Sequence, residues 1–183
     1  MIISAKETFG NLDSKDIKQN ILAVGIRELE LWKRAITADE KLFNQLYKFI
    51  FSDEQRLAWR SCWILDTASE EFPDLFAGKL PDLIEGLSTT KNSSLKRHFT
   101  RILSRYQIPE EFLGMVVNLS FDLLKPSEPA AVRVNALQIL YNIALQLPEL
   151  KGELIAVLEQ LIEDGGSAGF INRSTRLLKI LRS

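Results

Sequence analysis

The spacing of apolar side chains along the chain predicts helices. In the segment 93–106, Leu95, Phe99 and Ile102 recur every three or four positions, which places them on one face of an α-helix. The same period recurs in three other segments, 42–50, 132–147 and 150–162. The apolar–polar alternation of a half-buried strand is hard to find. The pattern therefore predicts an all-α chain.

Proline divides these helices at a regular interval. The dipeptide Ile-Leu begins at residues 21, 64, 102, 139 and 180, and an apolar-Pro-acidic triplet follows three of these copies, at 72–74, 108–110 and 147–149. Proline ends one helix and fits the first turn of the next, where the helix dipole favours an acidic residue. The sequence thus predicts a period of about 40 residues with two helices in each. A further triplet at 80–82 predicts a stepped second helix.

Two helix starts have the sequence of a capping box. In this motif the N-cap hydroxyl accepts a hydrogen bond from the backbone N–H three residues later, and the Glu or Gln side chain at that later position accepts one from the N-cap N–H. The two starts are Thr37 with Glu40, and Ser52 with Gln55. We expect Thr37 and Ser52 to be the N-cap residues of the helices that follow.

A two-helix period of this length resembles the HEAT and armadillo repeats. The clearest unit is 129–163, where Val132, Arg133, Ala136 and Leu140 are similar to the first helix of a HEAT repeat. The resemblance covers about 14–183 and implies a right-handed α-solenoid, which we expect to form a single domain over 1–183. Its expected parts are the repeats 14–51, 52–92, 93–128 and 129–166 and a capping helix, 167–183. In such a stack the segment 109–124, which is apolar nearly all round, is expected at the centre of the core.

Composition narrows the class of protein. The chain has 183 residues, of which 46% are hydrophobic and 26% charged, with a net charge of −1. These values exclude a disordered chain and a membrane-spanning one. The segment 1–10 has no apolar core of a secretory signal, so we expect a cytoplasmic protein. Cys62 and His98 are each the single residue of their kind, which excludes an internal disulfide and the common zinc sites.

Catalytic motifs are absent from the sequence, so we expect no enzyme and no cofactor. The glycine-rich segment 164–169 lacks the Lys-Ser/Thr of a phosphate loop. The segment 166–173 is similar to the signature loop of the fumarase and adenylosuccinate lyase superfamily, but it has neither the Met-Pro nor the lysine of that loop. A Cys62–His98 nucleophilic pair would need hydrogen-bond contact and an orienting third group, and the sequence predicts neither.

Repeat proteins of this kind act mainly by presenting a surface. The polar positions of the expected second helices are the candidate contacts, namely Asp82, Glu85, Asn118, Asp122, Glu153, Glu159 and Glu163. Their acidity favours a basic partner. The main hypothesis from the sequence is a non-catalytic protein-interaction or scaffold module.

Two alternatives stay open. The segment 91–106 contains five Lys or Arg and no acid, which favours binding to nucleic acid phosphates; its candidate contacts are Lys96, Arg97, Arg101 and Arg105. Trp59, Trp63 and Asp66 share a helix face and are similar in kind to the aromatic and acidic residues of HEAT-like alkylpurine DNA glycosylases. The other alternative is a subunit of a larger helical assembly, because the last helix has no partner in its own repeat.

Overall fold

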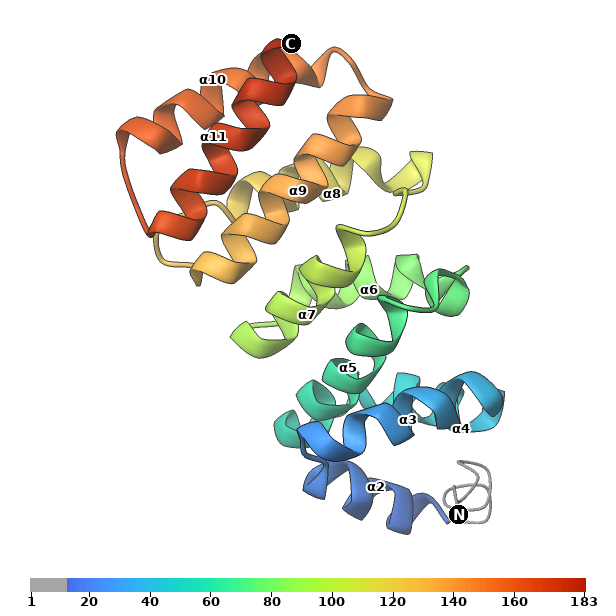
Figure 1. Cartoon of the computed structure of the whole chain (residues 1–183). Helices are drawn as coiled ribbons and strands as arrows, with labels where there is room; N and C mark the ends of the chain where they lie inside the picture. The colour runs from blue at the N-terminus through green and yellow to red at the C-terminus, as the bar shows by residue number, and fades with distance from the viewer. Residues whose placement is uncertain (1–12) are drawn as a thin grey trace. The chain divides into compact units, whose positions relative to one another are not determined.

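The computed structural model describes residues 13–183, which form helices and the turns between them with no strand (Figure 1). The all-helical architecture is confirmed. The chain divides into two compact units, Met1–Lys79 and Leu80–Ser183, and the first of these is described from Asp13 onward. No helix in the described part of the chain has the length and apolar composition needed to cross a membrane.

The first unit is organised around one helix, α5. Its elements are α2 (Ser14–Ala23), α3 (Ile26–Ala38), α4 (Glu40–Phe49), α5 (Gln55–Ser69) and the short 3₁₀ helix η1 (Pro73–Phe76). The α5 helix contacts the other four. Its buried side includes Ile64 and Leu65, and the core also contains Trp32 of α3 and an aromatic cluster of Phe43, Tyr47 and Phe76.

The helix starts lie later than the capping-box patterns predict. Asp39 is the N-cap of α4 and accepts hydrogen bonds from the backbone N–H groups of Lys41 and Leu42, at 2.9 and 3.3 Å. Thr37 instead stays within α3, where its hydroxyl donates to the Lys33 carbonyl at 3.0 Å. Ser52 precedes α5, and its hydroxyl accepts from the Glu54 N–H at 3.1 Å. Both capping-box predictions are therefore wrong; at α4 the carboxylate of Asp39, two residues later, takes the N-cap position.

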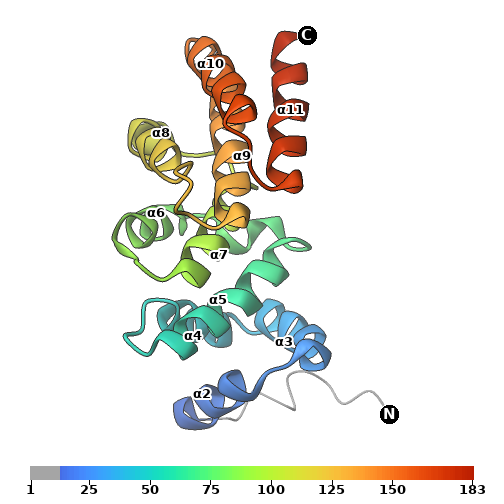
Figure 2. The same cartoon turned by 90° about the vertical axis from the view of Figure 1, so that its left-hand side faces the viewer.

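The second unit has two layers of helices. Its elements are α6 (Leu80–Thr89), α7 (Ser93–Leu103), the 3₁₀ helix η2 (Glu110–Phe112), α8 (Leu113–Asp122), α9 (Ala130–Gln146), α10 (Leu150–Glu163) and α11 (Ala168–Arg182). One layer is α7, α9 and α11, each packed against the next; α6 packs on α7, α8 on α9, and α10 on both α9 and α11 (Figure 2). The prolines at 73, 81, 109 and 148 mark helix starts or turns as predicted.

The centre of the second core is α9. This helix contacts α7, α8, α10 and α11 and buries Val132, Ala136 and Ile139. The prediction that the segment 109–124 is the centre is wrong: within α8 only Leu113, Val116 and Ser120 are buried. Met115 keeps 42% of its surface exposed. The reason is that α8 belongs to the outer layer, so one side of an apolar helix faces solvent.

A polar ladder fixes α9 against α7. Asn135 donates from its amide to the carbonyl of Arg97 and to the hydroxyl of Thr100, both at 3.2 Å. Asn142 donates to the carbonyl of Ser104 at 2.8 Å. The two asparagines are two turns apart on α9, and the two carbonyls are two turns apart along α7 and its C-cap. The bonds therefore set both the register and the rotation of the two helices.

Candidate functional site

Charge is segregated between the two layers of the second unit. The inner layer of α7, α9 and α11 contains eight Lys or Arg and no acid: Lys96, Arg97, Arg101, Arg133, Arg173, Arg176, Lys179 and Arg182. The outer layer of α6, η2, α8 and α10 contains eight acids and a single lysine, Lys151. The acids are Asp82, Glu85, Glu110, Glu111, Asp122, Glu153, Glu159 and Glu163. The unit therefore presents one positive and one negative layer.

The polar candidate contacts from the sequence all lie in the outer layer. The exposed members are Asp82, Glu85, Asn118, Asp122, Glu153 and Glu163, and Glu159 is half-buried. Two of the carboxylates form ion pairs inside the unit: Asp122 pairs with Lys125 at 2.7 Å, and Glu159 pairs with Arg182 of α11. Glu85, Glu153 and Glu163 are exposed and come from two different helices, so they are the carboxylates best placed to meet a partner.

One exposed apolar side chain, Met115, lies in the same layer as these acids. Met115 lies on the same side of α8 as Asn118 and Asp122, at intervals of three and four residues. It is one of the few large apolar side chains in the described chain with more than a third of its surface exposed. An exposed, flexible and polarisable methionine beside polar residues is typical of a protein-binding surface.

The basic candidates do not form one uniform stripe. Lys96 makes an ion pair with Glu128, so its charge is already compensated. Arg97 is exposed, Arg101 is half-buried, and Arg105 lies beyond the last residue of α7. On α11, burial lowers the pKa of Arg173, and the nearby charge of Arg176 lowers it further.

A pocket of about 360 Å³ lies among α7, α9 and α11. Arg97 and Arg101 line it from α7, while the first turns of α9 and α11 line it from the other two helices; its other lining residues are Ala130, Ala131, Val134, Asn135, Ser167, Gly169 and Phe170. Figures 1 and 2 both show the first turns of α9 and α11 lying next to each other. The sequence did not indicate this pocket, because its three walls are far apart along the chain.

Arg133 holds the first turn of α11, which lines this pocket, in place. Its Nε donates to the carbonyl of Leu124 at 2.9 Å, and its guanidinium lies 3.8 Å from the centre of the Phe170 ring. The residue is only 9% exposed. One side chain thus joins the end of the α8 segment, α9 and the first turn of α11.

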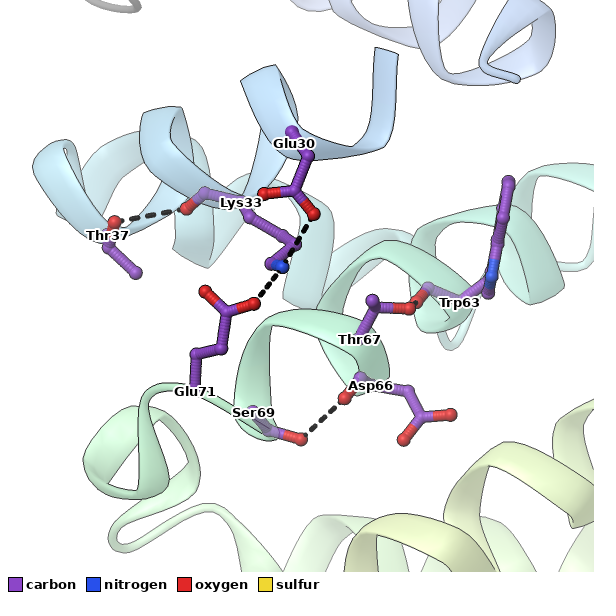
Figure 3. A network of polar contacts seen from close by, with 8 residues as sticks. All are labelled: Glu30, Lys33, Thr37, Trp63, Asp66, Thr67, Ser69 and Glu71. Atoms are coloured by element: carbon purple, nitrogen blue, oxygen red, sulfur yellow. Dashed lines mark hydrogen bonds and ion pairs between the residues drawn. The ribbon is translucent and has the colours of Figure 1, made fainter. Parts of the chain in front are cut away.

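The tryptophan and aspartate trio does not form an open cradle. The rings of Trp59 and Trp63 are half-buried and 6.5 Å apart, with Arg60 5.2 Å from the Trp59 ring. Asp66 is fully buried, and its carboxylate points away from the Trp63 ring (Figure 3). Asp66 is therefore not exposed on the surface with the two tryptophans.

The single cysteine is not placed for catalysis. Cys62 is fully buried, and burial raises the pKa of its thiol well above the usual range, with a smaller contribution from the charge of Asp66. A thiol kept protonated in an apolar environment is a poor nucleophile. Within residues 13–183 no group of three or more His, Cys, Asp or Glu side chains is arranged to hold a metal ion.

A buried lysine in the first unit has a structural role. Lys33 is 3% exposed, and its amine contacts Glu30 at 2.8 Å and also Glu71 (Figure 3). Hydrogen bonds to Glu30 and Glu71 raise its pKa. The contact with Glu71 ties α3 to the segment just after α5.

Comparison with known proteins identifies the class of this chain. The family model of the HEAT repeat domain matches residues 15–181, so the chain belongs to the HEAT repeat family. Together with the all-helical structure, this match establishes an α-solenoid fold class. No curated protein and no solved structure matches the chain. The class is that of helical-repeat interaction scaffolds, and family membership alone names no partner.

Proposed function

We propose that this protein is a non-catalytic binding module whose outer layer of α6, η2, α8 and α10 docks a basic segment of another protein. The observation that supports the proposal is the charge segregation of the second unit. Eight carboxylates gather on one layer, and the acid-free cationic layer lies behind it. A negative surface of this kind speeds encounter with a positive partner and disfavours acidic ones.

The outer layer also has the composition of a docking surface. Met115 supplies an exposed apolar contact on α8, and the same layer has exposed carboxylates such as Glu85 on α6 and Glu153 on α10. Binding energy at protein interfaces concentrates in a few apolar or aromatic contacts, while charged residues at the rim set specificity and association rate. The proposed partner segment therefore combines Lys or Arg with at least one large apolar side chain.

A peptide-display selection tests this proposal. The wild-type protein is expected to enrich peptides rich in Lys and Arg, and binding is expected to weaken as salt is raised. The variant with Glu85→Lys and Glu163→Lys should bind the enriched peptides about tenfold more weakly or worse, a loss of roughly 1.4 kcal/mol. The control variant, with Asp16→Lys and Asp53→Lys, has the same net charge but changes exposed acids of the first unit, and it should bind like wild type.

Two results contradict the proposal. One is a selection with no excess of basic residues over the starting library. The other is equal loss of binding in both double variants, which would show that net charge alone, and not the outer layer, governs the interaction.

A further inference from the structure

We propose that the inner face of α9 and α11 docks an acidic segment of another protein, one that combines Asp or Glu with a large apolar side chain. This face belongs to the cationic layer, so it is separate from the acidic outer layer that carries the proposed function. It consists of two rows of residues, one along each helix. The rows are Val134, Gln138, Tyr141 and Leu145 on α9, and Gly169, Arg173, Arg176 and Ile180 on α11.

The two rows border each other on one surface. In each row the residues recur every three or four positions, so they share one side of their helix. The two helices pack against each other (Figures 1 and 2), and Val134 and Gly169, which begin the two rows, line the same pocket. Further along, Tyr141 of α9 lies near enough to Arg173 of α11 to act on its pKa.

The cations of the inner face have no carboxylate to balance them. The helices α7, α9 and α11 contain no acid. Among the cations of α11, only Arg182 forms an ion pair with another described residue, Glu159 of α10. Burial lowers the pKa of Arg173, and the like charge of Arg176 lowers it further. Two neighbouring guanidinium groups without a counter-charge favour the approach of an anion.

Arg173 also has a hydrogen-bond donor that is not used. Its Nε atom is buried and has no acceptor within residues 13–183, and a buried donor without a partner costs free energy. No hydrogen bond to another described residue holds the side chain in its rotamer, so it can turn toward an arriving carboxylate. The planar fork of N–H groups then matches the two carboxylate oxygens, and Nε gains the acceptor that it lacks.

Exposed apolar side chains lie beside these cations. Leu145 has 65% of its surface exposed, and Ile180 has 42%. Leu145 lies one turn beyond Tyr141 in its row. Ile180 lies one turn beyond Arg176. Apolar contacts supply most of the binding energy at an interface, whereas exposed charges direct the encounter. The partner segment is therefore expected to carry a large apolar side chain as well as acids.

The same features favour a protein over a nucleic acid as the partner. A nucleic acid strand needs a continuous track of free cations. In this layer Lys96 and Arg182 are already held in ion pairs, and Arg133 is buried. An exposed aliphatic side chain such as Leu145 gives no attraction to phosphate groups, but it does pack against an apolar side chain of a protein.

Two matched double variants test the proposal. Leu145→Glu with Arg176→Glu removes one apolar and one cationic contact from the inner face. Both residues are exposed, so the variant is expected to fold, and thermal unfolding will show this. The control, Leu31→Glu with Arg34→Glu, makes the same two exchanges at exposed positions of α3 in the first unit. The two variants therefore have the same net charge.

Fluorescence anisotropy with labelled probes measures binding to the full chain. The main probe is a short peptide of Glu in which Leu recurs every three or four positions. Wild type and the control should bind it with a Kd of roughly 100 μM or tighter, and more weakly as salt is raised. Leu145→Glu with Arg176→Glu should bind it at least tenfold more weakly. Wild type should lose at least as much affinity when every Leu of the peptide is Ala.

A second peptide, with Lys in place of every Glu, reports on the outer layer. The two double variants should bind it alike, because neither changes a residue of that layer. Failure of this peptide to bind contradicts the proposed function, and failure of the Glu–Leu peptide contradicts the present proposal, so the two are tested independently.

Amide chemical shifts of the wild-type chain locate the binding site without any substitution. The Glu–Leu peptide should shift the amides of 134–145 and 169–180 most. The proposal is overturned if this peptide does not bind, if both double variants lose affinity equally, or if the shifts gather in other helices. It is also overturned if oligodeoxythymidine binds the inner face more tightly than the peptide does. Self-association of wild type in sedimentation that Leu145→Glu with Arg176→Glu abolishes would overturn it too, because the partner is then a second copy.

Discussion

Replacing Arg133 by methionine should destabilise the protein, because the guanidinium of Arg133 joins three elements. Methionine keeps an unbranched apolar stem of similar length, so the change removes the polar head with little change in packing. It deletes the hydrogen bond from Nε to the Leu124 carbonyl, at 2.9 Å, and the stacking on the Phe170 ring, at 3.8 Å. Both contacts lie in the interior, since Arg133 is 9% exposed.

The expected loss in the free energy of unfolding follows from these two contacts. A hydrogen bond from a charged donor contributes about 1.5–3 kcal/mol, and a desolvated cation–π contact about 2 kcal/mol. Removing a buried charge also relieves part of its desolvation cost, which offsets about half of this loss. We therefore expect the free energy of unfolding to fall by about 2 kcal/mol. For a chain of this length that corresponds to a fall in Tm of roughly 4–8 °C.

Urea unfolding followed by circular dichroism measures this loss directly. The control is Arg176→Met, which removes an exposed arginine of α11 and should change stability by no more than about 0.5 kcal/mol. If Arg133→Met is as stable as wild type, or more stable, the guanidinium does not hold the three elements together and the reasoning fails. A comparable loss in both variants would point to net charge instead.

Three further outcomes are expected. Asn142→Leu leaves the Ser104 carbonyl and the Gln138 amide without their partner, so it should cost about 1–2 kcal/mol in thermal unfolding, and a neutral result would argue against the ladder. Lys33 has a raised pKa, so its contribution to stability is complete below the ordinary lysine value of about 10.4 and is lost as pH rises through the higher pKa of the folded state. Lys33→Met should make the alkaline decline of stability shallower and leave the part that comes from the raised pKa of Cys62, which unfolding curves across that pH range will show. Cys62 should react with a thiol reagent only as fast as the protein unfolds, and rapid modification of the native chain would refute its burial.

The helices and their boundaries at proline were predictable because both depend on local sequence. The periodicity around Phe99 predicts α7, and Pro109 marks the start of the next element, η2, without knowledge of distant residues. The burial of α8 was not predictable in this way. The apolar positions near Met115 show that a helix is hydrophobic, but they do not show how many neighbours it has.

The pocket among α7, α9 and α11 could not be predicted residue by residue, for a different reason. Arg97, Ala130 and Gly169 come from three segments, and only the packing of the three helices brings them to one pocket. The sequence nevertheless contains a signal for the two charged layers. Counting charge helix by helix separates the acid-free helices from the acidic ones between them, and that alternation predicts two layers of opposite charge.

The polar ladder between α7 and α9 also limits how this chain can change in evolution. Asn135 and Asn142 both reach α7 because they are two full turns apart. A single inserted residue between them would rotate Asn142 by about 100° and turn its amide away from Ser104. Insertions and deletions are therefore expected to accumulate in the connectors around the ladder, such as 125–129, while the length of α9 between its two asparagines stays constant.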